Sequence, residues 1–206
     1  MGKIRIAYFL EDIAHEKFLR TLVARVAQQT GLSNDDLVEE VRNATGGSPR
    51  VFSELRMFLT DIQSVSTSLY QILIVATDSN CAKYTEVRVK ITAIIQRAGY
   101  HDPVVLAIPN PYIERWYVMD AEAFKSATDA TVVSKLPRKH RQRYSYKKIL
   151  REALLSAGIK PILGGAEYGE EIAMQIDLYK AEKADRSFGR FVRDLRRELG
   201  KLAQDQ

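Results

Sequence analysis

The sequence predicts an α/β fold: a mainly parallel four-stranded sheet covered by helices, followed by a helical C-terminal extension. Short apolar segments alternate with longer segments of helical periodicity over residues 3–108, as in sheets whose parallel strands are joined by helices. The apolar segments are nearly continuous, which is typical of strands buried on both faces. A composition of 46% hydrophobic and 28% charged residues suits a globular protein and excludes a disordered, collagen-like or coiled-coil chain.

Four segments have the apolar character of strands. The clearest is the run Tyr-Gln-Ile-Leu-Ile-Val-Ala-Thr at residues 70–77. The segment at 36–43 mixes apolar and charged residues, so we expect it to be half-exposed. The last strand is stopped by Pro109 and Pro111, because proline cannot donate a ladder hydrogen bond. The expected strands cover residues 3–10, 36–43, 70–77 and 103–108.

The segments between and after these strands have the periodicity of helices. In the first, Phe18, Leu22 and Val26 recur at helical spacing. Right-handed crossovers through such helices would place the C-terminal ends of all strands at one edge, where open α/β sheets bind ligands. The expected helices cover residues 13–29, 50–64, 82–98, 112–127, 145–157, 167–179 and 184–203.

Charge and composition suggest a boundary near residue 128. Residues 1–78 contain 8 Lys/Arg and 10 Asp/Glu, whereas residues 79–206 contain 23 and 16, so the positive charge lies in the C-terminal part. The stretch 128–143 begins with Thr, Ser and Pro and continues as a basic cluster. We therefore expect an α/β domain at 1–127 and a basic helical extension at 128–206 that packs on it.

Several classes of protein are excluded or disfavoured. The single cysteine, Cys81, excludes an internal disulfide and a Cys-rich zinc site. No apolar run approaches the ~18–20 residues of a membrane helix, so no membrane partner is expected. No small-residue cleavage site follows the first apolar run, and we expect a cytoplasmic location. The oligomeric state stays open, with a dimer as one option.

Acidic residues follow two of the predicted strands directly. Glu11 and Asp12 come after the first strand, and Asp78, Ser79 and Asn80 come after the strand at 70–77. Because parallel strands end at the same edge, these side chains should lie close together. Oxygen ligands of this kind suit a hard cation such as Mg²⁺. The alternative is that these acids cap helices, as Asp and Asn commonly do.

Three segments together resemble the Toprim superfamily, whose domains occur in topoisomerases, bacterial primases, recombination factors and nucleases of the overcoming-lysogenization-defect type. The segment 8–12, Tyr-Phe-Leu-Glu-Asp, resembles the first motif, and 72–80 resembles the second. The segment 108–120 contains prolines followed by Glu114, Trp116 and Asp120, a signature similar to that of small Toprim-like proteins often encoded beside an ATPase. The resemblance covers roughly residues 4–125 and implies a Rossmann-like sheet of the Toprim type.

The resemblance also implies a function and a site. It implies a nuclease that depends on Mg²⁺ or Mn²⁺, acts on nucleic-acid phosphodiesters and belongs to a defence or repair system. Glu11 would be the general acid/base and would act with Asp78. The implied metal ligands are Glu11, Asp78, Asn80, Glu114 and Asp120. The family has aspartate where this chain has Asn80, which brings no charge. The alternative is therefore a catalytically weak binding module that partners an ATPase.

Basic residues interleaved with tyrosines suggest a nucleic-acid surface at 138–151, which contains seven Lys/Arg and no acid. The alternatives are contact with a partner protein or no special role. The candidate nucleic-acid-binding residues are Arg138, Lys139, Arg141, Arg143, Lys147 and Lys148.

Three further side chains have expected roles. Trp116 should pack in the core, between the sheet and the C-terminal helices. His15 lies one helical turn after Glu11 and is expected on the helix surface, without a catalytic role. Glu114 is expected either in a structural ion pair, for which a nearby arginine is the candidate partner, or as an additional acid at the site.

Overall fold

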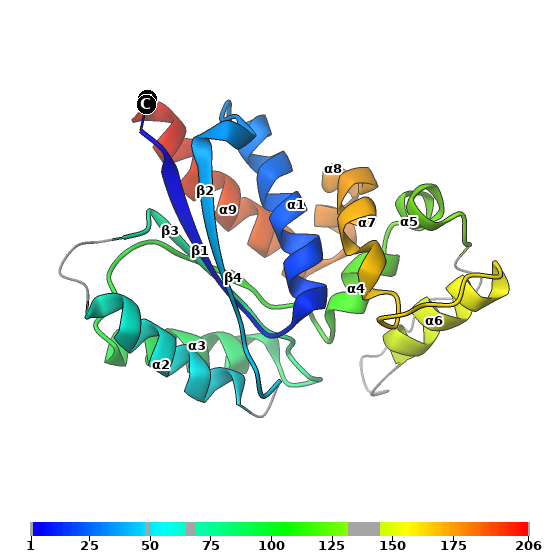
Figure 1. The fold of residues 1–206 in the computed structure, drawn as a ribbon, viewed down its shortest axis with the longest axis horizontal. Helices are drawn as coiled ribbons and strands as arrows, with labels where there is room; N and C mark the ends of the chain where they lie inside the picture. Colours follow the sequence, from blue (N-terminus) through cyan, green and yellow to red (C-terminus); the bar gives the residue numbers. More distant parts are fainter. Residues whose placement is uncertain (1, 48–49, 65–68, 132–144, 206) are drawn as a thin grey trace.

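The computed structural model describes residues 2–47, 50–64, 69–131 and 145–205 (Figure 1). It contains one four-stranded sheet in the order β2-β1-β3-β4, and all neighbouring strands are parallel. This confirms the predicted α/β class and its parallel sheet. The strands are β1 (Ile4–Leu10), β2 (Leu37–Asn43), β3 (Ile72–Ala76) and β4 (Val104–Ala107).

The register of the strands brings two turns to the same edge of the sheet. Leu10, the last residue of β1, pairs with Ala76, the last residue of β3. The backbone N–H of Glu11 donates to the carbonyl of Ala76 at 3.0 Å, and that of Thr77 donates to Ala107 at 3.1 Å. The ladder thus continues one residue beyond the strands, so the side chains that follow β1 and β3 start from adjacent positions.

Helices cover both faces of the sheet (Figure 1). Alternate residues of β1 face opposite sides because side chains in a strand point up and down in turn. Tyr8 belongs to a core cluster with residues of α1 (Ile13–Gln29) and α9 (Arg186–Gln204). Phe9 belongs to a second cluster with residues of α2 (Val51–Gln63) and α3 (Tyr84–Arg97). The two clusters are separated by the sheet itself.

The C-terminal helix α9 supplies part of the main core. Its residues Phe188, Phe191 and Leu195 are fully buried, in the same cluster as Ile6 and Ile74 of the sheet. The boundary expected near residue 128 therefore does not divide the core, because helices from beyond it complete one face of the sheet.

Five shorter helices lie beyond the C-terminal ends of the strands, beside the N-terminal end of α1 (Figure 1). Two 3₁₀ turns, η1 and η2, complete the described elements. These elements are η1 (Asn34–Asp36), α4 (Ile113–Val118), α5 (Ala121–Thr128), α6 (Ser145–Ser156), η2 (Ala166–Tyr168), α7 (Gly169–Gln175) and α8 (Leu178–Ala184).

The expectation of single helices at 112–127 and 167–179 is wrong. The first is divided at Asp120, which adopts an extended backbone and accepts a hydrogen bond from the N–H of Ala123, so that α5 begins anew. The second is divided at Asp177, which caps α8 by accepting from the N–H of Lys180. An aspartate at such a position stabilises a new helix start more than it stabilises helix continuation.

Trp116 lies in the core as predicted. It is fully buried, and its ring centroid lies 5.2 Å from that of Phe188 and 5.9 Å from that of Phe191. The indole Nε1 donates to the hydroxyl of Ser187 at 3.2 Å. Trp116 therefore fixes α4 against α9.

None of the helices in the described ranges combines the length and the apolar composition needed to cross a membrane.

Candidate metal centre

Three buried side chains with metal-binding atoms meet at the C-terminal edge of the sheet. Glu11 follows β1, His15 lies in the first turn of α1, and Asp78 follows β3. One potential ligand atom from each residue lies within 4.8 Å of the other two. The exposed fractions of these residues are 7%, 0% and 7%. We call this group the edge cluster, and its geometry could hold a metal ion.

Asp12 begins helix α1 and orients the histidine. Its Oδ1 accepts hydrogen bonds from the backbone N–H groups of Ala14 and His15, at 3.1 and 3.2 Å. The same oxygen lies 2.8 Å from Nδ1 of the His15 ring. The capping role that the sequence left open is therefore the role of Asp12. Because Nδ1 contacts Asp12, the other ring nitrogen, Nε2, is directed to the edge cluster.

The contact between His15 and Asp78 is close but incomplete. Nε2 of His15 lies 3.2 Å from Oδ1 of Asp78, which is within the distance of an ion pair but does not meet the geometry of a hydrogen bond. Nε2 is therefore buried without a hydrogen-bond partner among the residues that the structure describes. Burial lowers the pKa of His15, but the carboxylates of Asp78 and Asp12 raise it by more, so the pKa lies well above its usual value.

The carboxylate of Glu11 is held by two hydrogen bonds. Its Oε2 accepts from the hydroxyl of Thr77 at 2.7 Å and from the backbone N–H of Asp78 at 2.9 Å. Burial, together with the neighbouring carboxylate of Asp78, raises the pKa of Glu11 above its ordinary value. The site therefore favours a cation or a proton beside these two acids.

Asp78 also connects the edge cluster to the third motif. Its Oδ1 accepts a hydrogen bond of 2.8 Å from the backbone N–H of Ile113, the first residue of α4. Asp78 thus anchors the start of α4 while it faces His15. The helix that follows β3 begins after Lys83, so Asp78 is not the N-cap of that helix.

The expectation that His15 lies on the helix surface is wrong. The first turn of α1 packs at the edge of the sheet, between the turns after β1 and β3, and the imidazole is fully buried there. The signal in the sequence was the spacing of Asp12 and His15, which lie three residues apart on one helical face.

The other predicted ligands have different surroundings. Asn80 is exposed, and its Nδ2 lies 3.4 Å from the backbone carbonyl of Asp78. Asn80 as a ligand stays a prediction. Asp120 uses both carboxylate oxygens on backbone N–H groups, those of Ala123 at 3.1 Å and Asp177 at 3.0 Å. It joins α5 to α8 and does not belong to the edge cluster.

Glu114 forms an ion pair, which is one of its two expected roles. Its Oε1 lies 3.4 Å from Nζ of Lys147 on α6, whereas its Oε2 is buried without a hydrogen-bond partner in the described part of the chain. Burial raises the pKa of Glu114, Lys147 opposes this, and the charge of Asp78 adds to the rise. Glu114 is thus a largely buried acid whose pKa is raised in part by the charge of Asp78 in the edge cluster.

The predicted nucleic-acid-binding residues fall into two groups. Arg138, Lys139, Arg141 and Arg143 lie outside the described residues. Lys147 and Lys148 lie on α6 and differ in their contacts, since Lys147 pairs with Glu114 while the exposed Lys148 lies 3.6 Å from Glu152. Only Lys147 of these two therefore faces the buried acids.

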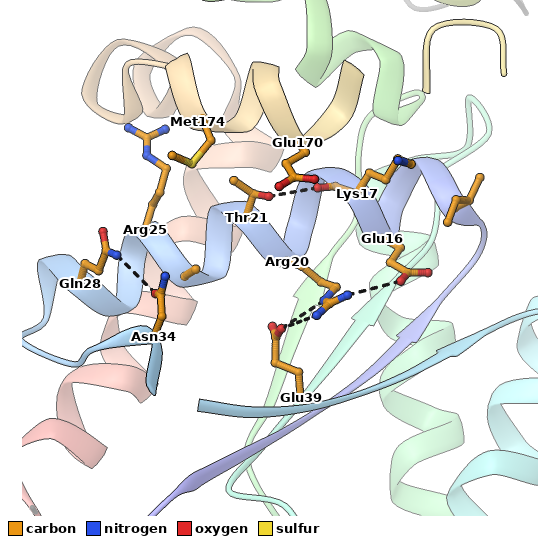
Figure 2. Close-up of a pocket in the computed structure, with 12 residues that line it drawn as sticks. Glu16, Lys17, Arg20, Thr21, Arg25, Gln28, Asn34, Glu39, Glu170 and Met174 are labelled. Atoms are coloured by element: carbon orange, nitrogen blue, oxygen red, sulfur yellow. Dashed lines mark hydrogen bonds and ion pairs between the residues drawn. The ribbon is translucent and has the colours of Figure 1, made fainter. Parts of the chain in front are cut away.

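A groove of about 490 Å³ runs along α1 and is separate from the edge cluster (Figure 2). The guanidinium of Arg20 lies across it and is held by Glu39 at 2.9 Å and by Glu16 at 3.7 Å. Arg20 is therefore paired with two carboxylates of the groove, which Lys17 and Arg25 also line. None of the three residues of the edge cluster lines it.

Comparisons of this chain with protein-family models, with curated proteins and with solved structures give no match.

Proposed function

We propose that the protein is a metal-dependent hydrolase of nucleic-acid phosphodiesters. The observation that supports this is the buried group of Glu11, His15 and Asp78 at the C-terminal edge of a parallel sheet. Open α/β sheets place their ligand sites at that edge. The resemblance of the surrounding motifs to Toprim nucleases supports phosphodiesters as the substrate.

The three ligand atoms favour one kind of metal. Two carboxylate oxygens and one imidazole nitrogen suit Mn²⁺ better than Mg²⁺, because Mg²⁺ prefers oxygen ligands and water. Nε2 of His15, which lies 3.2 Å from Oδ1 of Asp78, would become a ligand once a cation displaces its proton, because the ion then supplies the positive charge beside the carboxylates. A divalent cation in such a site neutralises charge on a phosphate and lowers the pKa of a water molecule.

Three side chains around the edge cluster would support metal binding or proton transfer. Asp12 fixes the ring of His15 through Nδ1, as second partners of metal-binding histidines do. Thr77 holds one oxygen of Glu11 and leaves the other oxygen for a cation or a proton. The buried Glu114, with its raised pKa, is a candidate to accept or donate a proton beside the substrate.

A second candidate function, that of a binding module without catalysis, also has an observation in its favour. The charged form of His15 would compensate the carboxylates of Asp78 and Asp12 with no cation present. A protein with a site of this kind would act through a partner, for which an ATPase is the candidate. Metal binding followed by an assay of cleavage separates the two functions.

The first experiment is calorimetry with Mn²⁺ and with Mg²⁺. Wild type should bind Mn²⁺ more tightly than Mg²⁺, and Asp78→Ala should abolish the binding. Glu122→Gln removes an exposed carboxylate on α5 and is the control that should bind as wild type does. Equal heats in all three proteins would overturn the metal site.

The second experiment is cleavage of plasmid DNA and of RNA with Mn²⁺. Cleavage by wild type that is lost in Glu11→Gln and kept in Glu122→Gln would support the hydrolase. A protein that binds Mn²⁺ at Asp78 but cleaves neither nucleic acid would overturn it in favour of the binding module. Co-purification with an ATPase would then be the next measurement.

A further inference from the structure

A cavity of about 270 Å³ lies between α6, α4 and the loop that precedes η2. Its volume is just below the ~300–1,000 Å³ of pockets for drug-sized ligands, so it suits a small ligand. We call it the α6 cavity. The lining residues used in the following argument are Ala14, Glu114, Tyr117, Lys147, Arg151 and Gly164.

The α6 cavity adjoins the edge cluster. Ala14, which precedes His15, lines it, and the hydroxyl of Tyr117 donates to the carbonyl of Ala14 at 2.8 Å. Tyr117 is fully buried and lines the cavity.

Two cations of α6 line the α6 cavity. Lys147 and Arg151 are four residues apart and therefore lie on the same face of the helix. The side chain of Lys147 is 49% exposed, and its Nζ lies 3.4 Å from Oε1 of Glu114. Arg151 is exposed and makes no ion pair within the described ranges. Its guanidinium is thus available for a bidentate contact with a phosphate.

The loop on the other side of the cavity is held by hydrogen bonds to a single carboxylate, that of Glu167. Glu167 accepts hydrogen bonds from the backbone N–H groups of Ile162, Leu163 and Gly165, at 2.6, 3.0 and 3.0 Å. Gly164, between them, has a φ of +68°, and a Cβ built there would meet no atom within 4 Å. The loop therefore presents its backbone to open space at the cavity.

We propose that the α6 cavity binds a phosphate monoester through Lys147 and Arg151, beside the edge cluster. A monoester, with a charge near −2, complements two cations, and it occurs at the end of a nucleic-acid strand and on a free nucleotide. This inference rests on the proposed function for its substrate class, nucleotides, but not on the metal.

The position of Lys147 relative to the edge cluster supports the assignment. Burial lowers the pKa of Lys147, but the carboxylates of Glu114 and Asp78 outweigh this and raise it. The ammonium is therefore charged and lies within the electrostatic reach of Asp78. A phosphate held by Lys147 would place the next part of a nucleotide chain near the edge cluster.

The test is calorimetry with adenosine 5′-monophosphate in the presence of EDTA, with adenosine as the ligand that lacks the phosphate. Lys147→Met and Arg151→Met should each weaken binding about tenfold or more, because each removes a charged hydrogen bond. Lys125→Met changes an exposed lysine on α5 that does not line the cavity, and it should bind as wild type does.

A variant that is expected to bind the ligand more tightly makes the test independent of folding. Glu114→Gln removes the carboxylate that pairs with Lys147 and repels a phosphate, so it should bind the monophosphate several-fold more tightly. Tighter binding cannot come from partial unfolding. Equal binding of adenosine and its monophosphate, or wild-type binding by Lys147→Met, would overturn the inference.

Two further ligands distinguish the sources of the phosphate. A 5′-phosphorylated trinucleotide that binds more tightly than its unphosphorylated form assigns the cavity to strand ends. Binding of the free monophosphate alone assigns it to nucleotides. Because EDTA is present throughout, a failure of the metal site leaves these results unchanged. If the protein binds the monophosphate but shows no Mn²⁺-dependent cleavage, the proposal for the α6 cavity stands and the proposal of a hydrolase is rejected.

Discussion

The imidazole Nε2 of His15 lies 3.2 Å from Oδ1 of Asp78, although one residue is on the first helix and the other follows the third strand. Both side chains are buried, and neither could carry its charge there alone at low cost. The pairing of His15 with Asp78 within the edge cluster therefore stabilises the protein when no metal is bound. A cation that binds this cluster would take the place of the charge on His15.

This relationship predicts that His15→Ala is destabilising when no metal is present. The variant leaves the carboxylates of Asp78 and Asp12 without their partner, and removal of one member of a buried ion pair costs about 3–5 kcal/mol. Urea unfolding in EDTA measures the loss. His101→Ala changes an exposed histidine before β4 and should stay within about 0.5 kcal/mol of wild type. Similar losses in both variants would contradict the role of the pair.

Asn80→Asp should tighten the binding of Mn²⁺ several-fold. The change introduces an aspartate, the residue that the Toprim pattern has at the position that Asn80 resembles, and adds a negative charge two residues from Asp78. The backbone permits it, because Asn80 has a φ of +50° and aspartate tolerates this region nearly as asparagine does. Calorimetry measures the affinity, with the exposed Asn34→Asp as the matched control. An unchanged affinity would remove position 80 from the ligand set.

The segment 138–151 should bind nucleic acid with a steep dependence on salt. Each phosphate that the protein neutralises releases condensed counterions, so affinity falls as salt rises. Replacing its first four basic residues by serine should weaken binding and flatten the slope, while Mn²⁺ binding stays unchanged. Fluorescence anisotropy with DNA and RNA measures both effects. Wild-type affinity in the variant would assign the segment to another partner. The four residues are Arg138, Lys139, Arg141 and Arg143.

Tyr70 gives a prediction on pH. Burial and the hydrogen bond that its hydroxyl donates to Glu40 at 2.6 Å raise the pKa of Tyr70 to about 12. An unfolded tyrosine releases its proton near pH ~10, so the stability that neutral Tyr70 contributes is complete below that pH and is lost as the pH rises through about 12. Tyr70→Phe should therefore cost about 1 kcal/mol at neutral pH.

Urea unfolding of both proteins between pH 7 and 12 measures this difference, which should shrink above pH 10. Tyr179→Phe, whose side chain is 69% exposed, is the control and should show no such change. A constant difference between wild type and Tyr70→Phe at all pH values would contradict the prediction.

Trp116→Ala should destabilise the protein by about 3–5 kcal/mol, because it empties a packed site between α4 and α9. Circular dichroism is the proper probe of unfolding, since Trp116 is the single tryptophan and its fluorescence is lost in the variant. Val89→Ala, on the exposed side of α3, should change the stability by less than about 0.5 kcal/mol. A loss below about 1 kcal/mol at Trp116 would mean that the core repacks.

The strands and the edge of the sheet could be predicted because they depend on local patterns. The apolar run at 70–77 fixes β3, and parallel pairing then brings Glu11 and Asp78 to the same edge. The positions of these two acids follow from topology alone. The helix breaks at Asp120 and Asp177 also had a local signal, an aspartate able to cap a helix, but helical periodicity continued across both.

The remaining parts of the site depend on contacts between distant segments. The burial of His15 arises from the packing of α1 against the turn after β3, which no local pattern encodes. The ion pair of Glu114 with Lys147 needs α6 to return over α4, so the sequence could suggest an ion pair but not its partner. Long-range packing of this kind determines which charged side chains lie near the site.

The position of α9 has a consequence for synthesis on the ribosome. This helix covers the face of the sheet that Ile6, Tyr8 and Ile74 present, yet it is translated on the order of ten seconds or more after β1. During that interval α1 covers only part of this sheet face, and the apolar residues that α9 will cover stay exposed on the nascent chain. Newly made protein should therefore depend on chaperones until residues 186–204 have emerged and docked.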